Sequence, residues 1–443
     1  MNDTVLIQNA TILSPERDAP LEGSVLVEGT TIAAVGDGPA SADVVIDGRG
    51  CLVVPGFVQA HVHFCQTLFR GVADDLDVMD WLREWIWPLE QAHDHASVGA
   101  SAALSIAELL LGGTTTTLSM ETVHHTDASF EAAERLGIRA FIGKAIMDRN
   151  EPGIEMLGED TDAAWADVEA LLERWHGAAD DRLRVALSPR APIGATDEMW
   201  RRCVAAAQDR DLVLHTHVNE NRDQARLVAA GRGTRDVEAL HELGALTPRL
   251  VMAHSVWLDP NERDLVRRHR PTVCHCPSAN MKLASGRAPV DEYLADGVNV
   301  ALGADGAPCN NRLDAFTEMR LAAIIHKPVA GPRAVPARVA FDMATMGGAR
   351  AVGLADRIGS IEVGKRADLV VIERGGAHVA PIGRSDPFSQ LVYAHTAADV
   401  RDVLVEGRAV VRDRTLTTGS VPAITAEAER QIDRLFVRLG RAT

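Results

Sequence analysis

Histidine and aspartate residues stand at the ends of several short apolar runs, where they could together bind a metal ion. The run GFVQAHVHF carries His61 and His63, and side chains two residues apart on a strand point to the same side. His217 lies in the run LVLHTHV, and Asp305 ends the run VNVALGAD. Three imidazoles and one carboxylate leave an open position for water, as in catalytic zinc sites. These residues predict a site for one divalent metal ion, with zinc as first choice and iron as the alternative.

Glu220 and His254 stand close to these positions and could assist a hydrolysis. A bound divalent metal lowers the pKa of its water from about 15.7 to about 7, which makes attack on an amidine-like ring carbon feasible at neutral pH. The departing nitrogen must be protonated, so a carboxylic acid beside the metal is required as a proton shuttle. We predict Glu220 for that role and Asp305 as the acceptor of the water proton. His254 is predicted to orient the water or to stabilise charge on the tetrahedral intermediate.

Strands and helices alternate through the middle of the chain. Runs such as IRAFIGKA, RLRVALSP and PTVCHCP are short and apolar, and helical stretches such as ASVGASAALSIAELLLGG separate them. This alternation is typical of parallel βα units. In (β/α)8 barrels the active site lies at the carboxyl ends of the strands, which is where the candidate residues stand. We therefore predict an α/β fold in which residues 55–355 form a (β/α)8 TIM barrel, the metal-dependent catalytic domain.

The two ends of the chain are rich in short strands instead of helices. VLIQNATIL and SVLVEGTTIAAVG lie near the start, and DVRDVLVEGRAVVRD lies near the end, before a final helix from about Ala426 to Leu439. We predict that residues 1–54 and 356–443 pair into one small β-sandwich domain beside the barrel.

Composition and charge restrict the partners that this protein can have. The chain of 443 residues has a net charge of −17, with 46% hydrophobic and 24% charged residues. Its negative charge repels phosphate backbones and anionic lipids, so we expect no nucleic acid and no membrane as partners. A small neutral or cationic molecule is the expected ligand. No basic leader precedes an apolar run, which predicts a cytoplasmic protein, and base rates are compatible with a homo-oligomer.

The other histidines and cysteines favour structural roles. His93 and His95 repeat the H-x-H spacing, but they lie near the start of a helical stretch, where residues two apart do not face each other. Cys274 and Cys276 flank a histidine on a predicted strand, and no second cysteine pair lies nearby. We predict buried thiols at these positions and no metal site.

The sequence resembles the amidohydrolase superfamily over essentially its whole length, and within it the branch of aminohydrolases with one metal ion. The motifs PGFVQAHVH, HVNE, AHS, HCPSANMKLASG and GADGAPCNN occur in the order of that family. The metal ligands that the resemblance implies are His61, His63, His217 and Asp305. It also implies Glu220 as the proton shuttle, assisted by His254. No lysine follows the predicted fourth strand in RVALSPR as a bridging ligand, which supports one metal over two.

Different stretches resemble family members with different substrates. LFRGVADDLDVMDWLREWIWPLE is similar to deaminases of S-adenosylhomocysteine and methylthioadenosine, whereas SPRAP and HVNENRD are similar to guanine deaminases. Arg190 stands where adenosine-type deaminases tend to have histidine, and its donor fork prefers a ring carbonyl or an unprotonated nitrogen. Gln66 could read the donor and acceptor edge of a lactam. Glu90 stands where nucleoside deaminases grip ribose hydroxyls, although guanine deaminases also carry glutamate there. These three are the predicted substrate-binding residues.

The resulting hypothesis is metal-dependent hydrolytic deamination of an amino-substituted nitrogen heterocycle. A guanine-like oxo-amino purine is the first choice of substrate because of Arg190 and Gln66. One alternative is deamination of S-adenosylhomocysteine or methylthioadenosine, since the loop GADGAPCNN departs from the guanine-deaminase pattern. Others are a triazine or pterin aminohydrolase and a chlorohydrolase. A scaffold protein without activity is disfavoured because every expected ligand and the proton shuttle are present.

Overall fold

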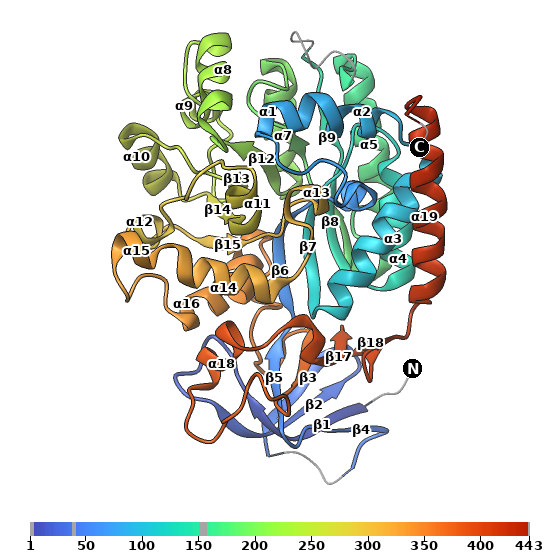
Figure 1. Cartoon of the computed structure of the whole chain (residues 1–443), viewed down its shortest axis with the longest axis vertical. Helices are drawn as coiled ribbons and strands as arrows, with labels where there is room; N and C mark the ends of the chain where they lie inside the picture. The colour runs from blue at the N-terminus through green and yellow to red at the C-terminus, as the bar shows by residue number, and fades with distance from the viewer. Residues whose placement is uncertain (1–3, 38–40, 150–156, 442–443) are drawn as a thin grey trace.

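The computed structural model has two sheet regions arranged along the long axis of the molecule (Figure 1). It describes residues 4–37, 41–149 and 157–441. Parts of the predicted terminal domain, at residues 1–3, 38–40 and 442–443, and residues 150–156 of the predicted barrel lie outside this description. One region joins strands from both ends of the chain, and the larger region contains the central strands with the helices around them (Figure 1).

The central strands are parallel and form two four-stranded sheets. The first sheet contains β6 (Phe57–Val62), β7 (Thr114–Met120), β8 (Arg139–Gly143) and β10 (Leu183–Val185). The second contains β12 (Leu214–Val218), β13 (Leu250–His254), β14 (Thr272–His275) and β15 (Val300–Leu302). Isolated parallel bridges, Leu187 with Leu214 and Val62 with Asp305, connect the outer strands of the two sheets. A further short pair joins β9 (Ala145–Ile146) to β11 (Ser188–Pro189).

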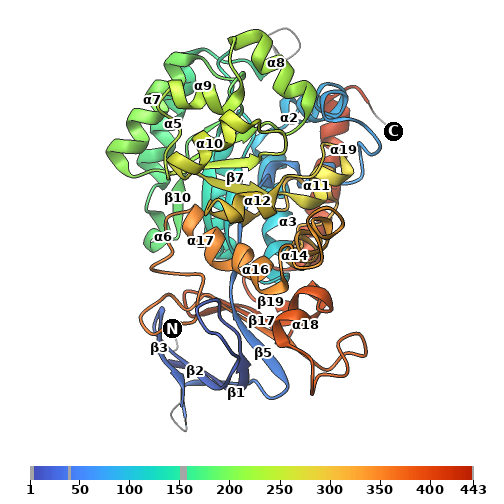
Figure 2. The same cartoon turned by 90° about the vertical axis from the view of Figure 1, so that its left-hand side faces the viewer.

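Helices surround these strands, which are buried along almost their whole length (Figure 2). The longer helices between or after them are α3 (His95–Leu111), α4 (Thr126–Leu136), α5 (Thr161–Trp175), α7 (Asp197–Arg210), α8 (Arg222–Arg232), α9 (Asp236–Glu242), α10 (Pro260–His269) and α14 (Ala315–Ile325). Shorter ones include α1 (Val78–Trp81), α2 (Trp87–Gln91), α6 (Ala178–Asp181), α11 (Pro277–Lys282), α12 (Val290–Ala295), α13 (Ala307–Asn310), α15 (Lys327–Ala330), α16 (Ala337–Asp342) and α17 (Gly348–Ala351). Covering helices on parallel strands explain why the strand sequences are nearly continuous apolar runs.

Helix α3 shows how local sequence sets these elements. Asp94 caps its first turn by accepting a hydrogen bond from the Ser97 backbone, and Ser97 in turn accepts one from the Asp94 backbone. This reciprocal capping box satisfies amide groups that have no partner within the helix. Gly112 follows the last residue, Leu111, and ends the helix.

One strand of the central region was not recognised in the sequence. β7 consists of TTTTLSM, and all seven of its residues are buried. Threonine favours strands because it is branched at Cβ, but its hydroxyl group makes the run look polar in a hydrophobicity pattern. The strand was therefore hidden by composition, although its neighbours β6 and β8 were predicted.

The strands near the two chain ends pair with one another. The members of this nine-stranded sheet are β1 (Thr4–Ile12), β2 (Leu21–Glu28), β3 (Thr31–Gly36), β4 (Val44–Asp47), β5 (Cys51–Pro55), β16 (Leu369–Glu373), β17 (Val400–Val405), β18 (Arg408–Arg412) and β19 (Thr415–Leu416). Strand β16 lies between β5 and β17 and so connects the two ends. Helix α18 (Pro387–Tyr393) precedes β17. The strands form one hydrogen-bonded sheet, and the β-sandwich shape stays a prediction.

The final helix, α19 (Val421–Arg438), packs along α3 at the side of the central region (Figure 1). It begins earlier than the predicted Ala426. Arg438 donates hydrogen bonds to the Ala92 carbonyl and to the Asp94 carboxylate. The helix lies within the predicted terminal segment 356–443, but its contacts are with the helices around the central strands.

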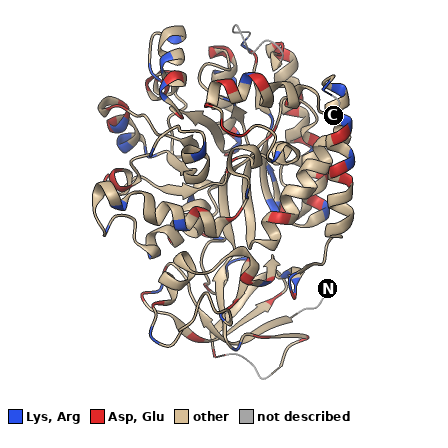
Figure 3. Ribbon diagram, viewed as in Figure 1, with Lys and Arg blue, Asp and Glu red and all other residues tan. Residues whose placement is uncertain are grey.

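Charged residues of both signs are interspersed along the outer helices, whereas the central strands are mostly uncharged (Figure 3). No helix in the part of the chain that the structure describes is long and apolar enough to cross a bilayer.

Candidate active site

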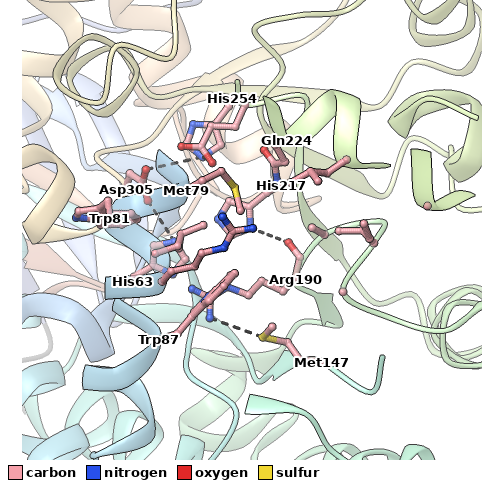
Figure 4. A pocket seen from close by; sticks show the side chains of 18 of the residues that line it. His63, Met79, Trp81, Trp87, Met147, Arg190, His217, Gln224, His254 and Asp305 are labelled. Carbon is pink, nitrogen blue, oxygen red and sulfur yellow. Dashed lines mark hydrogen bonds and ion pairs between the residues drawn. The ribbon is translucent and has the colours of Figure 1, made fainter. Parts of the chain in front are cut away.

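The predicted metal ligands and acid–base residues come together at the carboxyl ends of the central strands (Figure 4). His61 lies in β6 and His63 directly follows that strand. His217 is the fourth residue of β12, and His254 is the last residue of β13. Asp305 follows β15 and pairs with the end of β6 through the bridge to Val62. Strands distant in the sequence therefore bring these side chains to one place.

Asp305 lies at the centre of this cluster. Its Oδ1 atom is 3.2 Å from His61 Nε2 and 3.1 Å from His63 Nε2, and its Oδ2 atom is 3.8 Å from His254 Nε2. Ligand atoms of His61, His63 and His217 all lie within 4.8 Å of one another, and so do those of His61, His254 and Asp305. This spacing fits nitrogen and oxygen ligands around one ion.

The hydrogen bonds of the histidines prepare their Nε2 atoms for a metal. His63 Nδ1 lies 2.7 Å from the Met120 carbonyl, and His217 Nδ1 lies 2.7 Å from the Arg190 carbonyl. A carbonyl only accepts, so each Nδ1 carries a proton, and in the neutral imidazole each Nε2 then keeps a lone pair. Burial lowers the pKa of His217 well below its usual value, which favours the neutral imidazole that a metal requires. His61 Nε2 is buried and faces the Asp305 carboxylate, another proposed ligand. The donor set therefore fits a divalent cation.

Glu220 and His254 face each other beside the cluster. Their Oε2 and Nε2 atoms are 3.9 Å apart, and His254 Nδ1 is 2.9 Å from Asn280 Oδ1. Burial raises the pKa of the Glu220 carboxyl, and the negative charge of Asp305 adds to this effect. A raised pKa lets Glu220 carry a proton closer to neutral pH, as a proton shuttle must.

The backbone around these residues is strained. His254, Asp305 and Asn219 have φ angles of 70°, 64° and 45°, in the left-handed region that residues with a side chain rarely adopt. Such outliers cluster at functional sites, where the surrounding structure holds them. Asn219 is held on two sides, since its backbone N–H donates to Asp236 at 2.6 Å and its side chain donates to Glu262 at 2.8 Å. These bonds set the direction in which the next residue, Glu220, projects.

Two further residues, His215 and Asn280, contact the cluster and were not predicted from the sequence. His215 Nε2 lies 2.8 Å from His61 Nδ1, and Asn280 binds His254. His215 had a usable signal, because it stands two residues before His217 and repeats the spacing of His61 and His63. Asn280 had no such sequence signal, because nothing in the sequence indicates that the segment after β14 contacts the end of β13.

A cavity of about 440 Å³ opens above the cluster (Figure 4). Its polar end is lined by His63, His217, Glu220, His254 and Asp305. Its remaining wall is largely apolar and includes Met79, Trp81, Trp87, Met147, Ile193 and Leu227. An apolar cavity with a few convergent polar groups is typical of a site for a small ligand.

The predicted substrate-binding residues form a network among themselves. Arg190 donates to both carboxylate oxygens of Glu90, at 2.5 and 3.1 Å, and Gln66 Nε2 donates to Glu90 Oε1 at 2.8 Å. Arg190 and Gln66 line the cavity, whereas Glu90 lies behind them with a side chain only 1% exposed. Substrate binding by Gln66, Glu90 and Arg190 stays a prediction.

Structural roles were predicted for His93, Cys274 and Cys276. His93 has partners outside the cluster, and the two cysteines are buried free thiols. His93 lies 2.9 Å from both Ser97 Oγ and the Cys65 carbonyl oxygen. Cys274 and Cys276 are both buried and free.

Comparison with known proteins places this geometry in a family. Residues 52–410 match the model of the amidohydrolase family. The 5′-deoxyadenosine deaminase of Methanothermobacter thermautotrophicus is 40% identical over 94% of this chain and 95% of its own length. The 5-methylthioadenosine/S-adenosylhomocysteine deaminase of Halobacterium salinarum is 38% identical over 99% of this chain and 100% of its own length.

A solved structure agrees with these relatives. An adenosine deaminase from Xanthomonas campestris with bound zinc superimposes with a TM-score of 0.89 at 34% identity, over 98% of each chain. Likeness at this level implies a TIM-barrel fold with mixed α/β content. The family model and the relatives each cover most of the chain, and the chain therefore belongs to the amidohydrolase family and is a hydrolase that acts on C–N bonds.

Proposed function

We propose that this protein catalyses the metal-dependent hydrolytic deamination of an adenosine-type nucleoside. One observation supports this proposal most strongly. At the polar end of one cavity, Glu220 and His254 lie beside the four proposed metal ligands, which are His61, His63, His217 and Asp305. This arrangement supports hydrolysis at a carbon that bears an amino group. The names of the relatives, which are deaminases of 5′-deoxyadenosine or of methylthioadenosine and S-adenosylhomocysteine, support the adenosine-type ring.

We propose one divalent ion, zinc, bound by His61, His63, His217 and Asp305, with iron as the alternative. The buried Nε2 atom of His61, which lies beside the Asp305 carboxylate, and the zinc in the Xanthomonas campestris adenosine deaminase support this assignment. When bound, such an ion lowers the pKa of water at its open position and so supplies hydroxide near neutral pH.

The side chains of the protein then move the protons. Asp305 accepts the proton that the attacking water loses as its oxygen bonds to the ring carbon. Glu220 donates its proton to the adjacent ring nitrogen as the C=N double bond opens, and it then carries the proton of the newly added hydroxyl group to the exocyclic nitrogen. The C–N bond breaks, ammonia leaves, and the proton held by Asp305 returns to Glu220. His254 stabilises the negative charge that develops during the addition. The water oxygen stays on the ring as a carbonyl, so the products are ammonia and an oxo-purine nucleoside.

The guanine-like substrate, our first choice from the sequence, is not supported. It depended on the free donor fork of Arg190, but two N–H groups of this fork already donate to Glu90. The deaminases of Methanothermobacter thermautotrophicus and Halobacterium salinarum are named for adenosine-type substrates instead. We therefore propose Arg190 and Gln66 as the polar groups that face an adenosine-type substrate.

A panel of substrates tests this proposal. The metal-loaded protein is expected to release ammonia from 5′-deoxyadenosine or S-adenosylhomocysteine, with mass spectrometry showing an oxo group in place of the amino group. Ammonia from guanine but from neither nucleoside would contradict the proposed substrate. Chloride from a chlorotriazine without ammonia from any purine would instead favour a chlorohydrolase.

We also propose that residues 55–355 form a closed (β/α)8 barrel and that residues 1–54 and 356–443 form a β-sandwich. The two bridges that connect the outer strands of the central sheets support closure of the barrel. The pairing of β5 with β16 supports a terminal unit built from both chain ends.

A further inference from the structure

We propose that Glu262 is a positioning residue that locks the turn after β12 to the turn after β13 and so sets the separation between Glu220 and His254. Glu262 lies in α10 and is not one of the residues that line the cavity. The inference rests on the proposed function, in which Glu220 moves protons and His254 stabilises developing charge. It names a buried residue, outside the cavity, on which the geometry of both groups depends.

The two turns are joined by backbone hydrogen bonds. The Asn219 carbonyl accepts from the N–H groups of Val256 and Trp257, each at 3.1 Å, and the Ser255 N–H donates to the Val218 carbonyl at 3.0 Å. Asn219 and Ser255 have φ angles of 45° and 50°, in the left-handed region. Residues in such conformations persist where the surrounding structure holds them, so the shape of both turns depends on support from outside the turns.

Glu262 accepts four hydrogen bonds from groups around these turns. Its Oε1 atom accepts from the side-chain amide of Asn219 at 2.8 Å and from the Val237 backbone at 3.1 Å. Its Oε2 atom accepts from Arg235 Nε at 2.8 Å and from the Asp259 backbone at 3.0 Å. The side chain is 0% exposed. All the acceptor positions of this carboxylate are therefore used by the protein itself, and the loss of one oxygen would leave buried donors without a partner.

Arg235 extends this contact to the second turn. Its Nη2 atom donates to the Trp257 carbonyl at 2.6 Å, while its Nε atom donates to Glu262. Asp259 stands two residues after Trp257 and caps the first turn of α10. Glu262 thus holds the first turn directly through Asn219, and it holds the second turn through Arg235 and Asp259. The two turns share one anchor, and its loss should let them move relative to each other.

The proposed acid–base groups stand next to these turns in the sequence. Glu220 directly follows Asn219, and His254 directly precedes Ser255. Their Oε2 and Nε2 atoms are 3.9 Å apart. A displacement of about 1 Å at a reacting group can lower a rate about 100-fold. His217, in contrast, lies inside β12 and before the turn, so a shift of the turns should leave this proposed metal ligand in place.

Two variants break the anchor from opposite sides. Glu262→Gln keeps the size of the side chain, but only one of its two terminal atoms can still accept hydrogen bonds. Asn219→Gly removes only the side chain that reaches Glu262, and glycine adopts a positive φ without strain. Asp368→Asn is the matched control, because Asp368 is also a buried carboxylate that accepts from an arginine, Arg139, but it stands before β16, in the sheet of the chain ends.

The expected results concern 5′-deoxyadenosine and the bound metal. Glu262→Gln and Asn219→Gly should each lower kcat about tenfold or more and leave KM within about threefold, with the metal retained. The variant with both changes should lie within about threefold of Glu262→Gln, because both break the same link. Added to Glu220→Gln, the change Glu262→Gln should lower kcat by less than about threefold, since no acid is left to be placed. Asp368→Asn should unfold at a lower temperature and keep its kcat.

Several outcomes would overturn the inference. One is a kcat of Glu262→Gln close to that of the unmodified protein, or the same result for Asn219→Gly if Glu262→Gln does not fold. Another is an equal loss of kcat when Glu262→Gln is added to Glu220→Gln, and a third is an equal loss in Asp368→Asn. An unmodified, metal-loaded protein that releases no ammonia from any adenosine-type nucleoside would contradict the proposed function instead. A crystal structure of Glu262→Gln then decides the inference by itself, since we expect Glu220 and His254 to separate by about 1 Å more, and an unchanged separation would overturn it.

Discussion

At the scale of single residues, the site depends on partners that fix the direction of each imidazole. His61 differs from His63 and His217 because its Nδ1 atom faces another histidine, His215, and not a carbonyl. Residues that orient a metal ligand typically change metal affinity about 10- to 100-fold when they are removed. His215 is therefore expected to support the metal without binding it.

Replacing His215 with phenylalanine should weaken metal binding about tenfold or more, because the ring nitrogen that contacts His61 is lost. The measurement is a competition between the protein and a chelator of known zinc affinity. His93→Phe is the matched control, since His93 is also buried and hydrogen-bonded but binds Ser97 and Cys65. Equal zinc affinity of His215→Phe and the unmodified protein would show that His215 has no such role.

At the scale of elements, Asp236, the first residue of α9, accepts a hydrogen bond from the turn after β12 and titrates near neutral pH. Burial raises the pKa of Asp236 to about 7, and the nearby charge of Glu262 adds to this rise. The folded protein thus binds this proton more tightly than the unfolded chain does. Its contribution to stability is present at low pH and is lost as the pH rises through about 7.

Asp236→Asn should therefore become more stable relative to the unmodified protein as the pH rises. Asparagine keeps an oxygen that can accept from the Asn219 backbone and carries no charge. The difference in unfolding free energy between the two proteins should change by about 2 kcal/mol between about pH 5 and pH 8. Thermal unfolding across this range measures it, and a constant difference would show that Asp236 does not titrate there.

The elements were predictable where a single pattern decided them. Apolar runs ending in histidine or aspartate located β6, β12, β13 and β15, and with them the candidate ligands. Strand β7 was not predicted because its four threonines make the run look polar, although all of its residues are buried. The ion pair between Arg190 and Glu90 was not predicted for another reason. The two residues are 100 positions apart in the sequence, and only the folded chain brings them together. A single sequence shows which residues are able to take part in catalysis. It shows less clearly which of these residues contact each other in the folded protein.

At the scale of the whole molecule, the proposed metal ion would link strands from both halves of the central region. His61 and His63 come from the first sheet, and His217 comes from the second. An ion that binds only the folded chain adds to its stability, by about 4 kcal/mol at a free concentration 1,000 times its dissociation constant.

Removal of the metal should therefore lower the unfolding temperature by several degrees. Scans of the zinc-loaded protein with and without a chelator, at one fixed rate, measure the change. Asp305→Ala, which lacks a proposed ligand, should respond much less to the chelator. Identical unfolding temperatures for the loaded and the chelated protein would show that the ion does not bridge the two sheets.

The contacts made by the two ends of the chain were predictable only in part. Pairing between the chain ends followed from their similar strand-rich composition and is seen in the contact of β5 with β16. The packing of α19 on α3 was not predicted, because the apolar face of a helix does not reveal which surface it covers.

We propose that Glu220 transfers the proton that lets ammonia leave a metal-dependent site. The most direct test is ammonia release from 5′-deoxyadenosine per bound metal ion, compared between Glu220→Gln and the unmodified protein, with the exposed Asp223→Asn as control. We expect Glu220→Gln to keep its metal and to lose about 100-fold or more in kcat, because glutamine keeps the size but has no transferable proton. A metal-loaded Glu220→Gln that retains the unmodified rate would contradict the account.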